Sequence, residues 1–286
     1  MAPPAFRLPD ATILGPAHLQ VSDLTRSLDY YQHVLGLRAE RIATDRAVLT
    51  AGGDNLPLLI LRTRPGVTRA RRGAFGLYHV AILLPDRAAL GRFAAYLSAQ
   101  SIRVGMADHL VSEALYLWDP DGLGIEVYAD RPRETWQYRD RELVMTTDPL
   151  DVAGLIDAGE GRTWEGMPEN TAIGHVHLHV GDLDEAEAFY HRALGLDKTV
   201  WSYPGALFLS AGGYHHRLGT NVWSPGPAAS ADEARLLEWQ LVLPSDGDLA
   251  SVARHLREVR HAFDNTERGI RLADPWGTEV RLRTVA

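Results

Sequence analysis

The sequence predicts an α+β protein built from four βαβββ modules that pair into two domains. The first observation is a long internal repeat: HLQVSDLTRSLDYYQHVLGL at 18–37 matches HLHVGDLDEAEAFYHRALGL at 177–196. The second is that the remaining quarters also match, YHVAILLPD at 78–86 with EWQLVLPSD at 238–246, and DPDGLGIEVY at 119–128 with DPWGTEVRLR at 274–283. The chain therefore consists of two duplicated halves, each holding two related units.

Each unit is expected to begin with a β-rich strand, then an Asp or Pro turn and an amphipathic helix. The expected first strands are 17–21, 79–84, 175–180 and 239–243. The expected helices are 24–35, 88–98, 183–194 and 248–259. The first and third helices end at Leu-Gly-Leu, where Gly36 and Gly195 suit the C′ position. Further strands close each unit, and a DPxG turn joins the last pair in modules two and four.

Composition limits the classes of function. The chain has 286 residues, 45% hydrophobic and 23% charged, which is typical of a globular protein. A net charge of −8 argues against nucleic acid or an anionic membrane as partner. There is no cysteine, so any metal must be held by His, Asp and Glu, and twelve histidines are present. The first ten residues lack the order of a signal peptide, and no apolar run approaches ~18 residues.

We therefore expect a cytoplasmic protein, with homo-oligomerisation also expected. The expected domain boundaries are an N-terminal domain at 1–130 (modules one and two), a linker at 131–171 rich in charge, Gly and Pro, and a C-terminal domain at 172–286 (modules three and four).

Three residues in predicted strands make a candidate metal site. His79, Glu126 and His175 are two imidazoles and one carboxylate, the set that holds non-haem Fe(II) and leaves positions open for substrate and O2. A single His at the start of a strand is usually only a packed side chain, but the conjunction of three compatible ligands favours a site. A local His-x-His site formed by His175 with His177 and His179 is the competing interpretation. We prefer a cavity-wall or supporting role for those two.

The pattern resembles the vicinal oxygen chelate superfamily, in which paired βαβββ modules curl their sheets around a metal. The resemblance runs from about Gly15 to Arg283. Within the superfamily the chain resembles the two-domain type I extradiol dioxygenases, in particular bacterial catechol 2,3-dioxygenases. The segments that carry this closer likeness are GLYHVAILLPDR, DHLVSEALYLWDPDGLGIEVYADRPR, IGHVHLHVGDL and SAGGYHHRLGTNVW.

The resemblance implies that ligands come from the start of a module's first strand and from the fourth residue after the DPxG glycine. The first-strand positions hold, in module order, Pro16, His79, His175 and Glu238; the last-strand positions in modules two and four hold Glu126 and Arg281. Pairing modules one and two leaves one imidazole too few, and pairing three and four puts an arginine among the ligands. Only modules two and three give a complete set. We therefore expect modules two and three to pair, and modules one and four to form a vestigial site closed by an ion pair between Glu238 and Arg281.

The same resemblance suggests further active-site residues. His216 stands where related enzymes carry an acid–base histidine, with His215 expected on the other face. Tyr116, ten residues before Glu126, matches an active-site tyrosine. His109 matches a further histidine, although its spacing to Tyr116 departs from the family pattern by a couple of residues. An aromatic-sized pocket lined by Trp118, Trp201, Trp223 and Tyr128 is the last expectation.

The resemblance thus implies an Fe(II) enzyme, with Mn(II) as the alternative metal, that opens catechol or a substituted catechol with O2 to a 2-hydroxymuconic semialdehyde-type product, as in aromatic catabolism. A glyoxalase-like isomerase or lyase is the rival enzyme. It is disfavoured because 218–221 (LGTN) supplies no carboxylate as a fourth ligand. A metal-free small-molecule binder on the same fold is the non-enzymatic rival.

Overall fold

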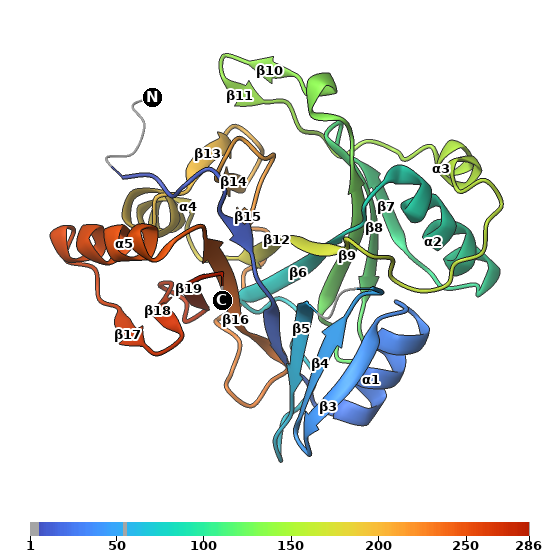
Figure 1. Cartoon of the computed structure of the whole chain (residues 1–286), viewed down its shortest axis with the longest axis horizontal. Coiled ribbons are helices and arrows are strands. Elements are labelled where there is room, and N and C mark those ends of the chain that lie inside the picture. The colour runs from blue at the N-terminus through green and yellow to red at the C-terminus, as the bar shows by residue number, and fades with distance from the viewer. Residues whose placement is uncertain (1–5, 54–55, 286) are drawn as a thin grey trace.

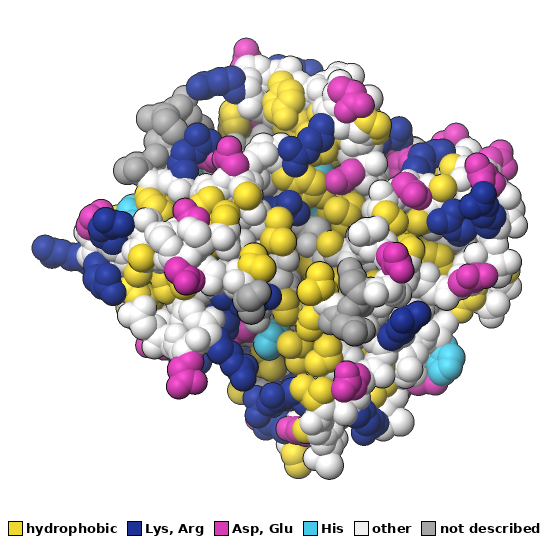
Figure 2. All heavy atoms as spheres, viewed as in Figure 1, with side chains coloured by type: hydrophobic (Ala, Val, Ile, Leu, Met, Phe, Trp, Pro, Cys, Tyr) yellow, Lys and Arg dark blue, Asp and Glu magenta, His cyan; other side chains and the backbone are white. Residues whose placement is uncertain are grey.

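A computed structural model describes residues 6–53 and 56–285 of the chain. The first five residues, on which part of the targeting expectation rests, lie outside these ranges. The described chain forms two large curled sheets, with helices on their outer sides (Figure 1). None of its helices is long and apolar enough to cross a lipid bilayer. Asp, Glu, Lys and Arg side chains are interspersed over the face seen in Figure 2.

The first sheet joins modules one and four. Its strand order is β17-β18-β19-β16-β2-β5-β4-β3, with β1 added to β16. The strands are β1 Ile13–Leu14, β2 Ala17–Gln20, β3 Arg38–Ala43, β4 Arg46–Thr50, β5 Pro57–Arg62, β16 Arg235–Leu243, β17 Asp264–Thr266, β18 Gly269–Ala273 and β19 Glu279–Thr284. The two modules meet where β2 pairs with β16 in antiparallel fashion.

The second sheet joins modules two and three in the order β13-β14-β15-β12-β6-β9-β8-β7. Its strands are β6 Gly76–Leu83, β7 Gly105–Asp108, β8 Ser112–Trp118, β9 Gly124–Asp130, β12 Ala172–His179, β13 Asp197–Val200, β14 Ala206–Ser210 and β15 Leu218–Asn221. Antiparallel pairing of β6 with β12 joins the modules. The predicted pairing of two with three and one with four is confirmed, so each sheet takes one module from each half of the sequence.

The module helices begin within two residues of the predicted positions, and each first turn is capped by a side chain. Asp23, Asp86, Asp182 and Ser245 accept a hydrogen bond from a backbone N–H three residues on. The helices are α1 Leu24–His33, α2 Arg87–Ala99, α4 Leu183–Ala186 and α5 Asp246–Glu258. The helix of the third module is not α-helical throughout as expected. After α4 it continues as a π-helix, η2, over Glu187–Ala193.

The segment between the halves has structure of its own. It contains the 3-10 turn η1 Arg133–Thr135, the small hairpin β10 Tyr138–Arg139 with β11 Glu142–Leu143, and α3 Val152–Ala158. Helix α3 packs against α2, where Gly91 is needed because a Cβ there would lie 2.1 Å from the carbonyl oxygen of Leu155. The segment is therefore anchored to module two.

The largest buried hydrophobic cluster of the described residues extends through both sheets. It includes Leu19 of β2 and Leu241 of β16 in the first sheet, and Val80 of β6 and Val176 of β12 in the second. Burial of these alternating strand positions favours one fixed register in each sheet, because a slip by one residue would expose them all. The polar positions of β6, β9 and β12 are then held toward the opposite face of the second sheet.

Candidate metal centre

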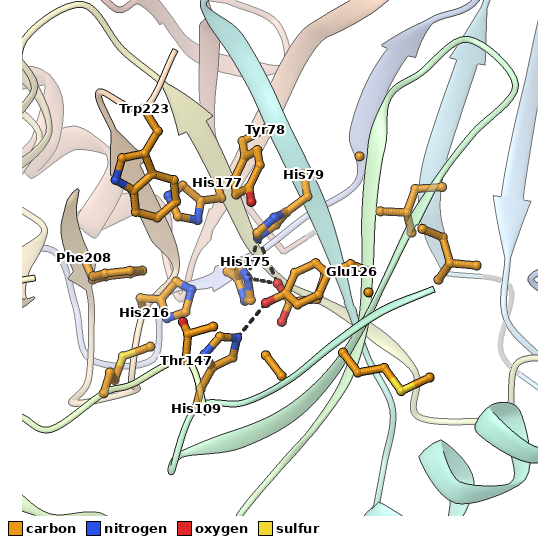
Figure 3. Close-up of a pocket in the computed structure, with 18 of the residues that line it drawn as sticks. Tyr78, His79, His109, Glu126, Thr147, His175, His177, Phe208, His216 and Trp223 are labelled. Atoms are coloured by element: carbon orange, nitrogen blue, oxygen red, sulfur yellow. Dashed lines mark hydrogen bonds and ion pairs between the residues drawn. The ribbon is translucent and has the colours of Figure 1, made fainter. Parts of the chain in front are cut away.

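His79, Glu126 and His175 converge at the centre of the second sheet (Figure 3). The Nε2 atom of His79 lies 2.9 Å from Oε2 of Glu126, and that of His175 lies 3.1 Å from the same oxygen. The two Nε2 atoms are 3.2 Å apart. Three metal-binding atoms from three adjacent strands thus point at one small volume.

Local sequence explains how Glu126 reaches this position. The DPxG turn before β9 has Gly122 at φ +88°, a conformation that favours glycine. Asp119 closes the turn by accepting hydrogen bonds from the N–H groups of Asp121 and Leu123, at 2.9 and 2.8 Å. Strand β9 then runs parallel to β6, with Glu126 beside Ala81. The count of four residues from glycine to carboxylate therefore follows from the turn and the strand period.

Burial and mutual charge set the protonation of Glu126 and His175. His79, Glu126 and His175 are only 4%, 2% and 1% exposed. Burial alone would raise the pKa of Glu126, but His175 and His79 outweigh it and hold that pKa well below its usual value. Burial lowers the pKa of His175 to about 4, against the opposing charge of Glu126. A carboxylate beside a neutral imidazole is the protonation state that a metal requires.

A cavity of about 310 Å³ opens above these residues. One wall is aromatic, and Figure 3 shows Tyr78, Trp223 and Phe208 around the cavity, with His177 among them. The Tyr78 ring lies 4.9 Å from that of His79 and 5.8 Å from that of Trp223, centroid to centroid. Such a space suits a small planar ligand.

His216 lines the cavity and His215 does not. Both lie between β14 and β15 rather than in a strand, and their Nδ1 atoms are 2.7 Å apart, so the expected opposite-face arrangement of strand neighbours is not found. The His216 ring is centred 4.0 Å from that of His175. Burial, followed by the neighbouring histidines, holds the pKa of His216 well below its ordinary value, so its ring is neutral. A neutral imidazole facing a cavity can accept a proton from a ligand.

Tyr116 and His109 form a hydrogen-bonded pair on the opposite wall. The Nδ1–H of His109 donates to the carbonyl of Thr146 at 2.6 Å, so its Nε2 accepts from the Tyr116 hydroxyl, also at 2.6 Å. Burial, followed by the charge of Glu126, raises the pKa of Tyr116 well above its usual value. The tyrosine therefore keeps its proton. The altered spacing between the two residues does not prevent their contact.

The remaining sequence-predicted residues divide into two groups. Trp118 and Trp223 line the cavity, whereas Trp201 packs on the main core and Tyr128 is buried with its hydroxyl 2.6 Å from that of Tyr214. His177 lines the cavity and His179 does not. Asn221 lies between these two histidines, with its Nδ2–H donating to Nε2 of His177 at 3.0 Å and its Oδ1 2.7 Å from Nδ1 of His179. Both therefore have a polar partner away from the three converging ligands.

Several cavity residues were not foreseen. Tyr203 and Phe208 come from module three, and Met145, Thr146 and Thr147 come from the segment between the halves. That segment reaches the cavity because Asp148 pairs with Asp108 at the end of β7. Nothing in its composition indicates this contact, whereas Tyr78 could have been suspected from its place beside His79.

At the equivalent positions of the first sheet no ligand set is found. Arg281 of β19 forms an ion pair with Glu238 of β16 at 2.6 Å, which confirms the pairing expected from the sequence. Within the described ranges, the one group of three or more His, Cys, Asp or Glu with metal-ligand geometry is that of the second sheet.

Comparison with known proteins agrees with this geometry. The family model of the Glyoxalase/Bleomycin resistance protein/Dioxygenase superfamily matches residues 13–127 and 172–282. The chain belongs to this superfamily. The two matched ranges correspond to modules one with two and modules three with four, and the resemblance proposed from the sequence is confirmed at the superfamily level.

Individual members of the superfamily differ in how closely they match. Catechol-2,3-dioxygenase of Bacillus subtilis (strain 168) is 44% identical over 270 residues, covering 92% of this chain and 94% of that protein. A crystal structure from Bacillus subtilis subsp. subtilis strain 168 superimposes with a TM-score of 0.67 at 12% identity, covering 98% of this chain and 86% of that one. Glyoxalase I from Zea mays gives 0.55 at 16% identity, covering 95% and 92%. The two structures show the shared fold alone.

Proposed function

We propose that this protein is an Fe(II)-dependent extradiol dioxygenase that opens catechol, or a substituted catechol, with O2 to a 2-hydroxymuconic semialdehyde-type product. The observation that carries the proposal is the convergence of His79, Glu126 and His175 beneath an aromatic cavity. The 44% identity to a catechol-2,3-dioxygenase over nearly the whole chain supports it independently. A role in aromatic catabolism inside the cytoplasm is part of the proposal.

The donor set fits a ferrous ion. Two imidazole nitrogens and one carboxylate oxygen lie within 4.8 Å of one another, and all three groups are buried. This is the 2-His-1-carboxylate combination of non-haem iron oxygenases, and Mn(II) accepts similar ligands. When bound, the metal supplies the open coordination positions at which a catechol and O2 meet, and the electron transfer between them.

The chain's own residues then perform binding and proton transfer. The aromatic wall holds the substrate ring, and its burial keeps water away from the reacting atoms. His216 is placed to accept a phenolic proton and to return it later in the reaction. The Tyr116 hydroxyl donates its hydrogen to His109, so on the other side of the cavity its oxygen is left as a hydrogen-bond acceptor.

The rival functions explain fewer of these features. A glyoxalase-like enzyme would use a fourth protein ligand, but the described β15 strand brings Asn221 rather than a carboxylate, and Asn221 bonds His177 and His179. A metal-free binding protein gives no reason for two imidazoles and a carboxylate to be buried together, since burying such groups unpaired is costly.

The test is anaerobic loading with Fe(II), followed by catechol and air, with the yellow ring-cleavage product followed by absorbance. Wild-type protein is expected to form the product, and Glu126→Gln and His216→Gln are expected to lose most of the activity. His18→Gln, in the first sheet, is the matched control and should retain it. Failure of loaded wild-type protein to bind metal or to open any simple catechol would overturn the proposal.

A further inference from the structure

A chain of hydrogen bonds runs from His216 away from the cavity to a carboxylate. The Nδ1 atoms of His216 and His215 lie 2.7 Å apart, and Nε2 of His215 lies 2.9 Å from Oδ1 of Asp130. Asp130 is the last residue of β9, four positions after Glu126 on the same strand face. The carboxylate side chain is 28% exposed, whereas His215 is fully buried.

These contacts determine where the ring hydrogens sit. A carboxylate only accepts hydrogen bonds, so Nε2 of His215 carries the hydrogen in its contact with Asp130. The Nδ1 of a neutral His215 is then a lone pair. A contact of 2.7 Å between two ring nitrogens requires one hydrogen, which must come from Nδ1 of His216. The Nε2 of His216 is then left with a lone pair.

We propose that Asp130 is a positioning residue that acts through His215 to keep His216 in its Nδ1–H tautomer, with the basic Nε2 free to accept a catecholic proton. The inference deepens the proposed function and rests on it for the identity of that proton. Asp130 touches no cavity atom and acts only by fixing the tautomer of its neighbour. The same logic is known for buried carboxylates that orient a catalytic imidazole in hydrolases.

The surroundings of Asp130 hold the chain of contacts in place. The Tyr214 hydroxyl donates to Oδ1 of Asp130 at 3.1 Å and lies 2.6 Å from the Tyr128 hydroxyl. The Tyr214 ring packs on His215 with centroids 4.1 Å apart, and Trp136 packs on His215 at 5.5 Å. A carboxylate placed only for stability would not need a second histidine aligned between it and the cavity.

The decisive variant is Asp130→Leu in the full-length chain. Leucine is close to aspartate in shape but offers no acceptor to His215 Nε2, so the His215 and His216 hydrogens are no longer held on Nε2 and Nδ1. We expect kcat of the Fe(II)-loaded enzyme to fall at least about tenfold while KM changes by less than about twofold. Asp130→Glu, which keeps an acceptor-only group, should recover at least part of the loss. Tyr214→Phe removes the other contact of Asp130 and is the structural control, expected to keep kcat within about threefold of wild type.

A second measurement does not depend on activity. Long-range ¹H–¹⁵N correlation spectra of metal-free protein distinguish the two imidazole tautomers, and His216→Gln identifies the His216 signals by their loss. We expect the Nδ1–H pattern for His216 in wild type and in Tyr214→Phe, and an increased share of the Nε2–H pattern in Asp130→Leu. An unchanged pattern in Asp130→Leu, or an equal loss of kcat in Tyr214→Phe, would overturn the inference.

The two proposals can fail separately. If loaded wild-type protein opens no catechol, the proposed function fails, while the spectra of the metal-free protein still decide whether Asp130 sets the tautomer. If wild-type protein is active and Asp130→Leu keeps both its kcat and the Nδ1–H pattern, the positioning role of Asp130 alone is wrong.

Discussion

Arg281 and Glu238 occupy, in the first sheet, the places that Glu126 and His79 occupy in the second. The guanidinium donates through Nε and Nη2 to Oε2 of Glu238, at 2.8 and 2.6 Å. The other carboxylate oxygen accepts from Gln240 at 2.9 Å. Burial opposes ionisation of Glu238, but Arg281 and Gln240 outweigh it and hold its pKa below the ordinary value. One module pair thus carries candidate ligands where the other carries an ion pair.

Breaking this pair from one side should be destabilising. The two side chains are only 13% and 8% exposed, so Arg281→Met leaves a largely buried carboxylate without its partner. We expect the free energy of unfolding to fall by about 3 kcal/mol. The double variant Glu238→Met with Arg281→Met should return to within about 1 kcal/mol of wild type. Urea denaturation of the three proteins measures this, and stability of the single variant equal to that of wild type would show that the pair contributes little.

Removing the carboxylate of the candidate site should weaken metal binding and leave the fold unchanged. Glu126→Gln keeps the shape of the side chain but removes the negative charge and one good ligand. Fe(II) or Mn(II) affinity is expected to fall at least about tenfold, which corresponds to about 1.4 kcal/mol. Metal content after dialysis and anaerobic titration are the measurements. His18→Gln is the control, and similar metal content in both variants would place the metal elsewhere.

Gly36 follows α1 and has a backbone conformation that disfavours a side chain. It also lies too close to Gly166 for a Cβ to fit. Its φ is +76°, and a Cβ would lie 2.5 Å from the Cα of Gly166. At Gly66 φ is +86° but nothing lies within 4 Å of such a Cβ. We therefore expect Gly66→Ala to cost about 1–2 kcal/mol and Gly36→Ala clearly more, because its backbone contact must also open. Thermal unfolding of both variants tests this, and equal losses would mean that the contact with Gly166 is easily relieved.

The architecture could be predicted because several separate segments of the sequence are repeated in its second half. The match of 18–37 with 177–196 aligns the modules, and the requirement for one complete ligand set then selects their pairing. His79, Glu126 and His175 come together as expected, because strand period and a DPxG turn fix which face each side chain takes. These are local rules that hold inside every module.

Other features depend on contacts that no local pattern encodes. The helix after Asp182 becomes a π-helix at Glu187, although the matching segment of module one is α-helical throughout. Thr146 reaches the cavity from a segment whose composition indicates only a connection. The sequence predicts Tyr128 in the cavity wall, but the side chain is buried and its hydroxyl forms a hydrogen bond with the hydroxyl of Tyr214. In each case the outcome depends on which distant residue packs beside the segment.

Asp119 should make stability depend on pH in the direction opposite to an ordinary paired carboxylate. Burial raises the pKa of Asp119 from its ordinary value of 3.8 to about 6, against the hydrogen bonds that it accepts from Leu123 and Asp121. A carboxyl whose pKa is higher in the folded state stabilises the fold fully below the unfolded pKa, and this contribution is lost as pH rises through about 6. The loss is about 3 kcal/mol, since each pKa unit corresponds to about 1.4 kcal/mol.

Asp119→Asn cannot ionise, so the stability of wild type relative to this variant should fall by about that amount between pH 4 and pH 8. Urea denaturation of metal-free protein across this range provides the difference, and a value that stayed constant or increased with pH would contradict a buried carboxyl with a raised pKa at this turn.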